Sequence, residues 1–285
     1  DYQQHLHKVA PQKDVDGNRR DTSAHLASIY ALLREGIGHD FSQYKHNTLL
    51  RRIQRRMQVL RIDTTPAFIQ RLRKEPRQVD LLFREFLIGV TQFFRDPHAF
   101  EALQSTVIPK LLEHKSAEDT IRIWVPACGT GEEVYTIAIL VREALEREGS
   151  ALKVQIFGTD IDDDAVAIAR AARYSKMEGV TRERNERWFT EDGEEYRPVR
   201  EVREMCIFST HSVVKDPPFS KLDLISCRNL LIYLETGLQD RLMQTFHYAL
   251  RPEGYLCLGQ SESITRKTKL FATLDKKHRI FQRGE

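Results

Sequence analysis

The spacing of apolar residues along the 285-residue chain changes in character near residue 90. Upstream of that point, "NTLLRRIQRRMQVLRI" places Leu49, Ile53 and Met57 four residues apart, which is the rhythm of one helix face. "TPAFIQRLRK" opens with a capping Thr and a Pro, and "QVDLLFREFLIG" reads as a further amphipathic helix ending at Gly89. Because no strand-like run occurs within residues 22–87, this stretch predicts a small all-helical domain.

Downstream of residue 90, strand-like runs alternate with helix-like ones. "IRIWVPA" is followed by a helix predicted over Glu132–Glu148, "KVQIFGTD" by "DAVAIARAA", "LDLISCR" by "LQDRLMQTFHYAL", and "GYLCLGQ" by "HRIFQR". Repeated alternation of this kind is typical of an α/β fold with a doubly wound, mostly parallel sheet.

The alternation breaks at about residues 174–210, where "EEYRPVREVREMCIFSTH" predicts a short antiparallel hairpin after a helix ending near Trp188. We therefore expect a small β subdomain inserted into the α/β domain. The resulting division is a linker or tail over 1–21, a helical domain over 22–90 and an α/β domain over 91–285. The chain begins without Met, and we expect it to be part of a longer, multidomain protein.

Composition supports a globular protein outside the membrane. Hydrophobic residues make up 41% and charged residues 30%, and no apolar run approaches the roughly 20 residues of a membrane span. The four cysteines lack CxxC spacing and lie in apolar segments, so we expect reduced core thiols, no metal site and a cytoplasmic location.

Charge is unevenly distributed although its sum is only +3. Residues 45–77 contain ten Lys or Arg against two acidic residues, and four of the arginines lie off the apolar helix face: Arg51, Arg52, Arg55 and Arg56. Such a cluster is either a solvated helix face or a surface that meets an acidic partner.

A glycine turn provides the first candidate for chemistry. "ACGTGEE" connects a strand to a helix, and Gly129 permits a close approach of backbone to a ligand. The motif lacks the third glycine of a dinucleotide fingerprint and the GK[ST] of a P-loop. Asp160, at the end of the next strand, is placed to hold ribose hydroxyls. Glu133 would repel a pyrophosphate but suits the ammonium and sulfonium groups of S-adenosylmethionine.

These carboxylates also have purely structural interpretations. Glu132 and Glu133 lie in the first turn of a helix, where negative charge stabilises the helix dipole. Asp162, Asp163 and Asp164 are typical of a helix cap and first turn rather than of a ligand site.

Five sequence blocks, in this order and spacing, resemble those of CheR-type chemotaxis receptor methyltransferases: "VTQFFRD" (Val90–Asp96), "ACGTGEEVYTIAI" (Ala127–Ile139), "GTDID" (Gly158–Asp162), "ISCRNLLIYL" (Ile225–Leu234) and "GYLCLGQSES" (Gly254–Ser263). The combination of residues in these blocks is similar to that of CheR modules in multidomain signalling proteins. The resemblance implies a Rossmann-like, S-adenosylmethionine-dependent methyltransferase that forms glutamyl methyl esters on receptors, with S-adenosylhomocysteine as product.

The implied reaction agrees with the side chains available. A glutamate with an ordinary pKa of about 4.3 is already ionised at neutral pH, so no general base is needed. The methyl group leaves a cationic sulfur, so no acid is needed either, and catalysis reduces to alignment of the reactants.

The resemblance also implies roles for individual residues. It implies that Arg95 lies at the cofactor and steers the substrate carboxylate, and that Tyr233 lies near the transferred methyl. Further cofactor-binding residues are implied at Thr91, Gly129, Glu133, Asp160, Ser212, Val213, Arg228 and Asn229. Ser212 and Gly89 depart from the family, which often has Asn at both positions. The structural alternative for Arg95 is an ion pair with Asp96. The structural alternative for three further residues is packing in the core: Tyr233, Phe93 and Phe94.

In the family, the basic helix faces the acidic methylation region of the receptor, which makes Arg51, Arg52, Arg55 and Arg56 candidate substrate-binding residues. The expected partner is the cytoplasmic domain of a methyl-accepting chemotaxis receptor, and we expect a monomer that neither inserts into a membrane nor binds nucleic acid. The loop "TEDGEEYRP" is short and acidic, which predicts that a receptor C-terminal pentapeptide is not used as a tether.

Two other functions compete with this interpretation. "DPPF" (Asp216–Phe219) resembles the catalytic motif of nucleic-acid adenine methyltransferases, although it precedes its strand, whereas in that class the motif follows it. A non-catalytic module that senses S-adenosylmethionine or S-adenosylhomocysteine is the second alternative, and Arg95 and Tyr233 argue against it.

Overall fold

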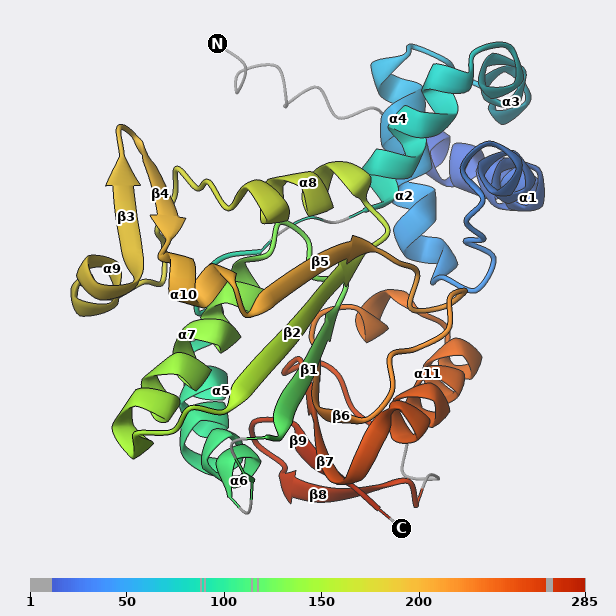
Figure 1. The fold of residues 1–285 in the computed structure, drawn as a ribbon. Coiled ribbons are helices and arrows are strands. Elements are labelled where there is room, and N and C mark those ends of the chain that lie inside the picture. The colour runs from blue at the N-terminus through green and yellow to red at the C-terminus, as the bar shows by residue number, and fades with distance from the viewer. Residues whose placement is uncertain are drawn as a thin grey trace. The chain divides into compact units, whose positions relative to one another are not determined.

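The computed structural model describes residues 12–87, 89, 91–113, 115–116, 118–264 and 269–284, with side chains from residue 21 onward. The described residues form two compact units (Figure 1). One lies within Asp1–Ile88 and takes in Tyr233–Glu235, and the other lies within Gly89–Ile232 and Thr236–Glu285. Each unit is considered by itself.

The first unit is helical, as predicted. It contains α1 (Gln12–Ile37), α2 (His46–Val59), α3 (Thr65–Lys74) and α4 (Pro76–Phe86). Its buried face includes Ile29, Leu33, Phe41, Ile53 and Leu82, each with 0% of its surface exposed. Helix α1 begins inside the stretch predicted as a linker or tail, and α4 ends at Phe86 rather than at Gly89.

The second unit is built on a seven-stranded sheet in the order β5-β2-β1-β6-β7-β9-β8. Neighbouring strands run parallel from β5 to β7, whereas β9 is antiparallel to β7 and β8. The strand bounds are β1 Thr120–Pro126, β2 Lys153–Asp160, β5 Cys206–Thr210, β6 Leu222–Cys227, β7 Leu250–Leu258, β8 Phe271–Asp275 and β9 Ile280–Arg283. The order reverses between β1 and β6, which is where doubly wound folds bind their ligands.

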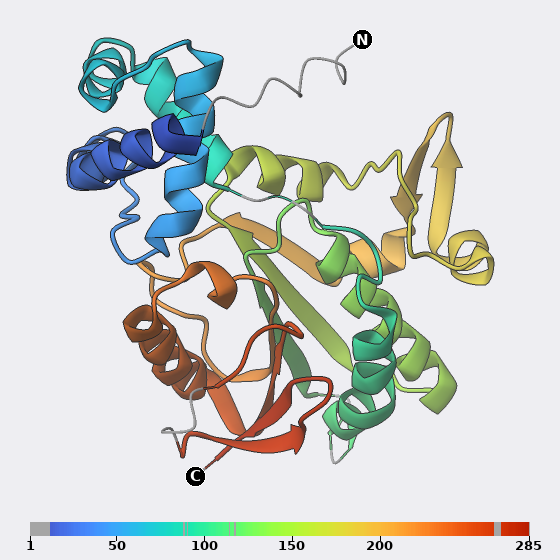
Figure 2. The same ribbon diagram turned by 180° about the vertical axis from the view of Figure 1, so that it is seen from behind.

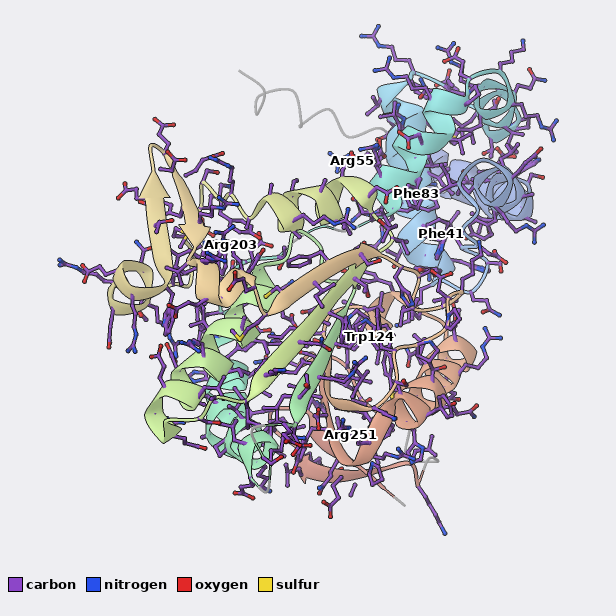
Figure 3. The ribbon with its side chains drawn as sticks, viewed as in Figure 1. Phe41, Arg55, Phe83, Trp124, Arg203 and Arg251 are labelled. Carbon is purple, nitrogen blue, oxygen red and sulfur yellow. The ribbon has the colours of Figure 1, made fainter. Side chains whose placement is uncertain are left out.

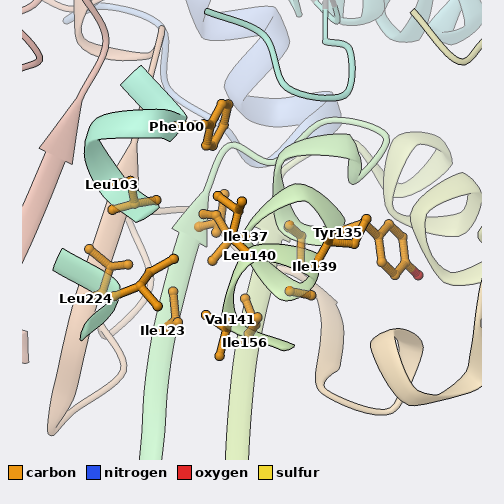
Figure 4. Close-up of a cluster of buried hydrophobic side chains, with 14 of the residues drawn as sticks. Phe100, Leu103, Ile123, Tyr135, Ile137, Ile139, Leu140, Val141, Ile156 and Leu224 are labelled. Atoms are coloured by element: carbon orange, nitrogen blue, oxygen red, sulfur yellow. The ribbon is translucent and has the colours of Figure 1, made fainter. Parts of the chain in front are cut away.

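Alternating residues of β1 build both faces of the sheet. Ile121, Ile123 and Val125 join the core cluster under α7 (Glu132–Glu148), which Figure 4 shows in close-up. On the same side α5 (Pro97–Ala102), the π-turn η1 (Leu103–Val107) and α6 (Ile108–Leu112) pack beside α7 (Figure 2). Trp124 points to the other face and packs edge-on against Phe246 of α11 (Thr236–Ala249), 5.8 Å between ring centroids. This two-sided burial is the expected property of a parallel sheet.

Several predicted elements are confirmed. Helix α7 has the bounds predicted from the sequence, and α8 (Asp163–Ala171) and α11 lie in the segments predicted as helical. Asp162 caps α8 by accepting hydrogen bonds from the backbone N–H groups of Asp164 and Ala165, at 3.0 and 3.3 Å. Helix α9 (Arg182–Trp188) ends at the predicted residue.

Two secondary-structure predictions made from the sequence are wrong, one on strand pairing and one that assigned a helix. The inserted hairpin consists of β3 (Phe189–Asp192) and β4 (Glu195–Pro198), followed by the one-turn helix α10 (Arg200–Arg203). The segment "CIFST", predicted as part of that hairpin, is instead β5 of the main sheet, because Phe208 packs into the core there. "HRIFQR" contains strand β9 and not a helix, since Ile280 and Phe281 are both buried in the sheet.

None of the helices in the described part of the chain has the length and apolar character that crossing a membrane requires.

Candidate cofactor site

The glycine turn joins β1 to α7 through a series of left-handed backbone conformations. Ala127, Gly129 and Gly131 have φ values of 54°, 55° and 94°. A Cβ at Gly131 would lie 2.8 Å from the Cβ of Ala169, closer than such atoms approach one another. A Cβ at Gly129 would lie 3.4 Å from the Cγ2 of Thr91, which brings that predicted residue to the turn. Both the torsion angles and the crowding therefore favour glycine here.

Asp160 fastens this turn to the end of β2. Its Oδ2 accepts a hydrogen bond from the backbone N–H of Gly129 at 2.8 Å, and its Oδ1 accepts one from Asp162 at 3.0 Å. Burial raises the pKa of the Asp160 carboxyl above its usual range, and the two backbone hydrogen bonds oppose that rise. A negative group is thus fixed beside the turn, where the sequence predicts a ribose contact.

Glu133 reaches across to β6 rather than back to its own helix end. Ser226 Oγ donates a hydrogen bond to Glu133 Oε1 at 2.7 Å, and Arg228 Nη1 lies 3.6 Å from Glu133 Oε2. Burial raises the pKa of the Glu133 carboxyl, while the positive charges of Arg228 and Arg95 lower it. Glu132 differs, because within the described part of the chain its carboxylate accepts one hydrogen bond, a local one from Thr130 Oγ1 at 2.7 Å. Stabilisation of the helix end therefore accounts for Glu132 but not for Glu133.

Arg228 is the centre of a buried ion-pair network, with 3% of its side chain exposed. Its Nη2 donates to Asp96 Oδ2 at 2.7 Å, and its two terminal nitrogens lie 3.3 and 3.4 Å from the carbonyl oxygen of Arg95. The guanidinium carbon lies 4.7 Å from the centroid of the Phe100 ring. Asp96 thus forms an ion pair with Arg228.

The "TQFF" segment places Arg95 through its buried neighbours. Phe93 and Phe94 lie in the core, as predicted, with 0% and 4% of their surfaces exposed. The backbone N–H of Phe94 donates to Thr136 Oγ1 of α7 at 3.1 Å. Phe94 and Asp96 have φ values of 49° and 59°, so Arg95 lies between two strained residues. Backbone strain of this kind is concentrated at functional sites.

Ser212 and Val213 lie in the loop that follows β5. The Ser212 backbone N–H donates to Asp216 Oδ2 at 2.7 Å, and Ser212 Oγ accepts a hydrogen bond from the backbone of Lys215 at 3.2 Å. Asp216 belongs to the "DPPF" sequence, whose Phe219 stacks on Phe157 with 4.6 Å between ring centroids. Both ends of that sequence therefore make structural contacts, which weakens the adenine-methyltransferase interpretation.

A buried carboxylate that sequence reasoning missed holds the loop after β6. Glu262 is 3% exposed, and its oxygens accept hydrogen bonds from the backbone N–H groups of Asn229, Leu231 and Gly259 at 3.0, 2.7 and 2.6 Å. Asn229 has a φ of 63°, so this loop is also strained. The only sequence signal was the position of Glu262 within the "GQSES" block.

Seven predicted residues are brought together in the α/β unit at the carboxyl ends of β1, β2 and β6, namely Thr91, Arg95, Gly129, Glu133, Asp160, Arg228 and Asn229. Tyr233 lies instead in the 3-10 turn η2 (Leu231–Tyr233) and is grouped with the helical unit, where its carbonyl oxygen accepts a hydrogen bond from the Lys45 N–H at 2.8 Å.

The four arginines of α2 divide into two kinds. Arg52 Nη1 donates to the carbonyl oxygen of Glu85 at 2.7 Å. Arg56 donates to Gln78 Oε1 at 2.7 Å and to Glu85 Oε1 at 3.1 Å, so both residues help to fasten α4. Arg51 and Arg55 are exposed. The substrate-binding prediction is therefore better supported for Arg51 and Arg55 than for the other two.

The residues at the turn fit S-adenosylmethionine. Glu133 and Asp160 are partly buried carboxylates whose pKa is raised by burial, so a cation beside them would stabilise their charged forms. At Gly129 the absence of a side chain leaves the backbone open to close approach. A cationic ligand with ribose hydroxyls suits this donor and acceptor set better than a pyrophosphate, which the carboxylates would repel.

Comparison with known proteins agrees with this chemistry. Residues 89–280 match the family described as "CheR methyltransferase, SAM binding domain", and residues 24–87 match "CheR methyltransferase, all-alpha domain". An uncharacterized 104.1 kDa protein of Rhodobacter capsulatus is 38% identical over 85% of this chain, which spans only 26% of that relative. The putative methyltransferase Cher3 of Pseudomonas putida is 32% identical over 94% of this chain and 99% of its own length.

A third relative carries a more specific name. The chemotaxis protein methyltransferase of Listeria innocua is 30% identical, covering 82% of this chain and 87% of its own. The two family matches together cover both units of the structure. The chain therefore belongs to the CheR methyltransferase family, and its α/β unit is that family's S-adenosylmethionine-binding methyltransferase domain.

Proposed function

We propose that this protein methylates glutamate side chains in the cytoplasmic domain of chemotaxis receptors, forming glutamyl methyl esters. The observation that carries the proposal is Glu133, a partly buried carboxylate with a raised pKa that is held between Ser226 and Arg228 beside the glycine turn. Relatives named chemotaxis protein methyltransferase support the receptor as substrate.

The cofactor supplies a methyl group on a cationic sulfur, and the protein binds and orients the reactants. In this proposal Glu133 binds the charged methionine part and Asp160 the ribose. Ser212 and Val213 flank the adenine, while Thr91, Arg228 and Asn229 complete the site. Arg95 steers the incoming carboxylate, and Tyr233 lies near the transferred methyl. Because the substrate carboxylate is already ionised, none of these residues has to remove a proton.

The proposal extends to the organisation of the chain. We assign residues 22–90 to a substrate-recognition domain and residues 91–285 to the catalytic domain, in a cytoplasmic protein that acts as a monomer. Arg51 and Arg55 on α2 contact the acidic methylation region of the receptor. The short hairpin β3–β4 supports the hypothesis that no C-terminal pentapeptide tether is used, and a measurable affinity for such a peptide would contradict it.

The proposal is tested by incubating the protein with methyl-labelled cofactor and either receptor-containing membranes or DNA. We expect base-labile label on the receptor and none on DNA. Arg95→Ala should abolish transfer while cofactor binding weakens only partly. Label on DNA alone would support the adenine-methyltransferase alternative, and cofactor binding without any transfer would support the sensor alternative.

The role of the basic helix needs a matched pair of variants. The double variant Arg51→Gln and Arg55→Gln should raise the KM for receptor about tenfold with little change in kcat, because rim charges act mainly on association. Arg73→Gln with Arg77→Gln removes the same charge from exposed positions of α3 and α4. Equal effects of the two pairs would show that only net charge matters and would refute the assigned contact.

A further inference from the structure

A cavity lies in the α/β unit, behind the glycine turn. It has a volume of about 420 Å³ and opens between α7, α8, α10 and the edge strand β5. Three arginines line it, Arg170, Arg200 and Arg203, together with a single carboxylate, Glu204, and the rings of Tyr135 and Phe208. Arg203 is labelled in Figure 3 at the junction of the inserted hairpin and the sheet.

The arginines of this cavity retain unused hydrogen-bond donors. Arg203 is half-buried, and its Nε donates to the Pro198 carbonyl oxygen at 3.0 Å. Arg170 donates through Nε and Nη2 to the Phe208 carbonyl oxygen, at 3.2 and 3.0 Å. Within the described residues, the two terminal nitrogens of Arg203 and the Nη1 of Arg170 donate no hydrogen bond to another group.

The charge at the cavity is not balanced by the protein. Arg200 Nε donates to Glu204 Oε1 at 2.6 Å, which pairs the lining carboxylate with an arginine whose side chain is 82% exposed. Arg170 and Arg203 make hydrogen bonds to carbonyl oxygens but to no carboxylate among the described residues. Paired guanidinium groups with free terminal nitrogens are the usual recognition elements for phosphate oxygens.

The size of the cavity indicates a small ligand. A volume of about 420 Å³ lies in the range of small-molecule sites, roughly 300–1,000 Å³. The Tyr135 hydroxyl is already occupied, because it donates to the Ala169 carbonyl oxygen at 2.8 Å. The rings of Tyr135 and Phe208, whose centroids are 5.4 Å apart, form the buried base of the cavity, with 2% and 9% of the two residues' surfaces exposed.

Phe208 connects this cavity with the glycine turn. Its ring atoms lie 2.7 Å from the position that a Cβ would take at Gly158 and 3.2 Å from that position at Gly131. Tyr135 follows Glu132 and Glu133 on the first turns of α7. A ligand that moved either ring would therefore press on the backbone that carries the cofactor site.

We propose that the cavity between α8, α10 and β5 binds a small phosphorylated ligand, and that its occupancy is coupled to cofactor binding through Phe208 and the glycine turn. Coupling between two sites is reciprocal, so the cofactor must change the affinity of the phosphorylated ligand by the same factor. The proposal concerns a site separate from the methyl-transfer residues and does not depend on the receptor as substrate.

The test uses inorganic pyrophosphate as the probe and titration calorimetry on the intact protein. We expect saturable 1:1 binding, weakened about tenfold or more by Arg203→Gln and less by Arg200→Gln, because each removes charge-assisted hydrogen bonds. Arg182→Gln removes an equal charge from α9, where the side chain is 92% exposed, and should bind pyrophosphate as the unmodified protein does. If Arg203→Gln fails to fold, Arg200→Gln decides the matter, since its side chain is 82% exposed.

Coupling is tested by measuring the dissociation constant of S-adenosylhomocysteine with and without saturating pyrophosphate. We expect a change of about threefold or more, and the same factor in the reverse titration. Four results would each overturn the proposal. These are absence of saturable binding, equal weakening by Arg182→Gln, simple competition between pyrophosphate and S-adenosylhomocysteine, and an unchanged dissociation constant.

Discussion

The two sides of the glycine turn carry opposite charge and are built in different ways. On the cofactor side, the carboxylates of Glu133 and Asp160 are partly buried, and each has hydrogen bonds or ion pairs that fix its position. On the other side, Arg170 and Arg203 retain unpaired donors at a cavity that opens to solvent.

The difference shows how much each side is preorganised. A buried carboxylate held by several donors cannot reorient, so it presents a fixed field to a cation. An arginine held through part of its guanidinium retains rotamer freedom and loses it only when an anion binds. A single substitution on the cofactor side should therefore change cofactor affinity strongly. A single substitution at the cavity should change the affinity for an anion by a smaller factor.

The largest effect is expected from Glu133→Gln. The amide keeps the shape and can accept the hydrogen bond from Ser226, but it removes the charge that pairs with Arg228. The dissociation constant of S-adenosylmethionine should rise about a hundredfold, which corresponds to about 3 kcal/mol for loss of a buried ionic partner. Calorimetric titration measures this constant directly.

Glu132→Gln is the matched control for that change. Its carboxylate makes only the local contact with Thr130, so the constant should change by less than about threefold. Equal effects of the two variants would mean that the charge of the helix end, and not the specific position of Glu133, attracts the cofactor.

The variant Gly131→Ala tests the packing between the glycine turn and the residues behind it. A Cβ there meets Ala169 and Phe208 and is attached to a backbone with a φ of 94°, so the free energy of unfolding should fall by about 2 kcal/mol. Gly149→Ala, at a φ of 61° with no atom within 4 Å, isolates the backbone strain without the crowding. Denaturant unfolding of both variants gives the difference. If the two lose equal stability, crowding behind the turn is unimportant.

The sequence predicts best those features that depend on neighbours in the chain. The bounds of α7 follow from Gly131 and Gly149, which end the helix at either side in left-handed conformations. The turn and Asp160 were also found, because the end of each parallel strand lies a short, regular distance from the next helix. Asp162 was assigned correctly as a cap for the same reason.

Features that depend on distant partners were missed. Strand β5 was assigned to the hairpin, because nothing in "CIFST" indicates pairing with β2 rather than with "EEYRP". Arg52 and Arg56 were treated as one surface with Arg51 and Arg55, although Glu85 and Gln78 of α4 bind them. Glu262 was overlooked, since its importance comes from backbone groups more than thirty residues away.

A smaller effect is expected from Glu262→Gln, which tests how firmly the cofactor side is held. The amide leaves fewer acceptors for the backbone N–H groups of Asn229, Leu231 and Gly259, so the free energy of unfolding should fall by about 1.5 kcal/mol. Cofactor affinity should fall with it, because the Asn229 loop follows directly on Arg228. Glu148→Gln, at an exposed position of α7, should leave both unchanged. Unaltered affinity in Glu262→Gln would separate this loop from the site.

The smallest predicted effect is the pH dependence of stability and of cofactor binding. Because burial raises the pKa of Glu133 and Asp160 in the folded protein, the folded state holds these protons more tightly than the unfolded chain. Their contribution to stability is therefore present below the unfolded pKa values, about 4, and is lost as pH rises through the raised folded values. A bound cation opposes the rise in pKa, because it favours the charged form of both carboxylates.

Binding of S-adenosylmethionine should accordingly release a fraction of a proton near the raised pKa values, and the number released should fall as the pH rises above them. Calorimetry in buffers of different ionisation enthalpy measures the number released. Glu133→Gln should reduce it, whereas Arg203→Gln, on the far side of the turn, should not. Proton uptake in place of release would mean that the ligand does not bring positive charge to these carboxylates, and the contrast between the two sides of the turn would then have to be explained without the cofactor.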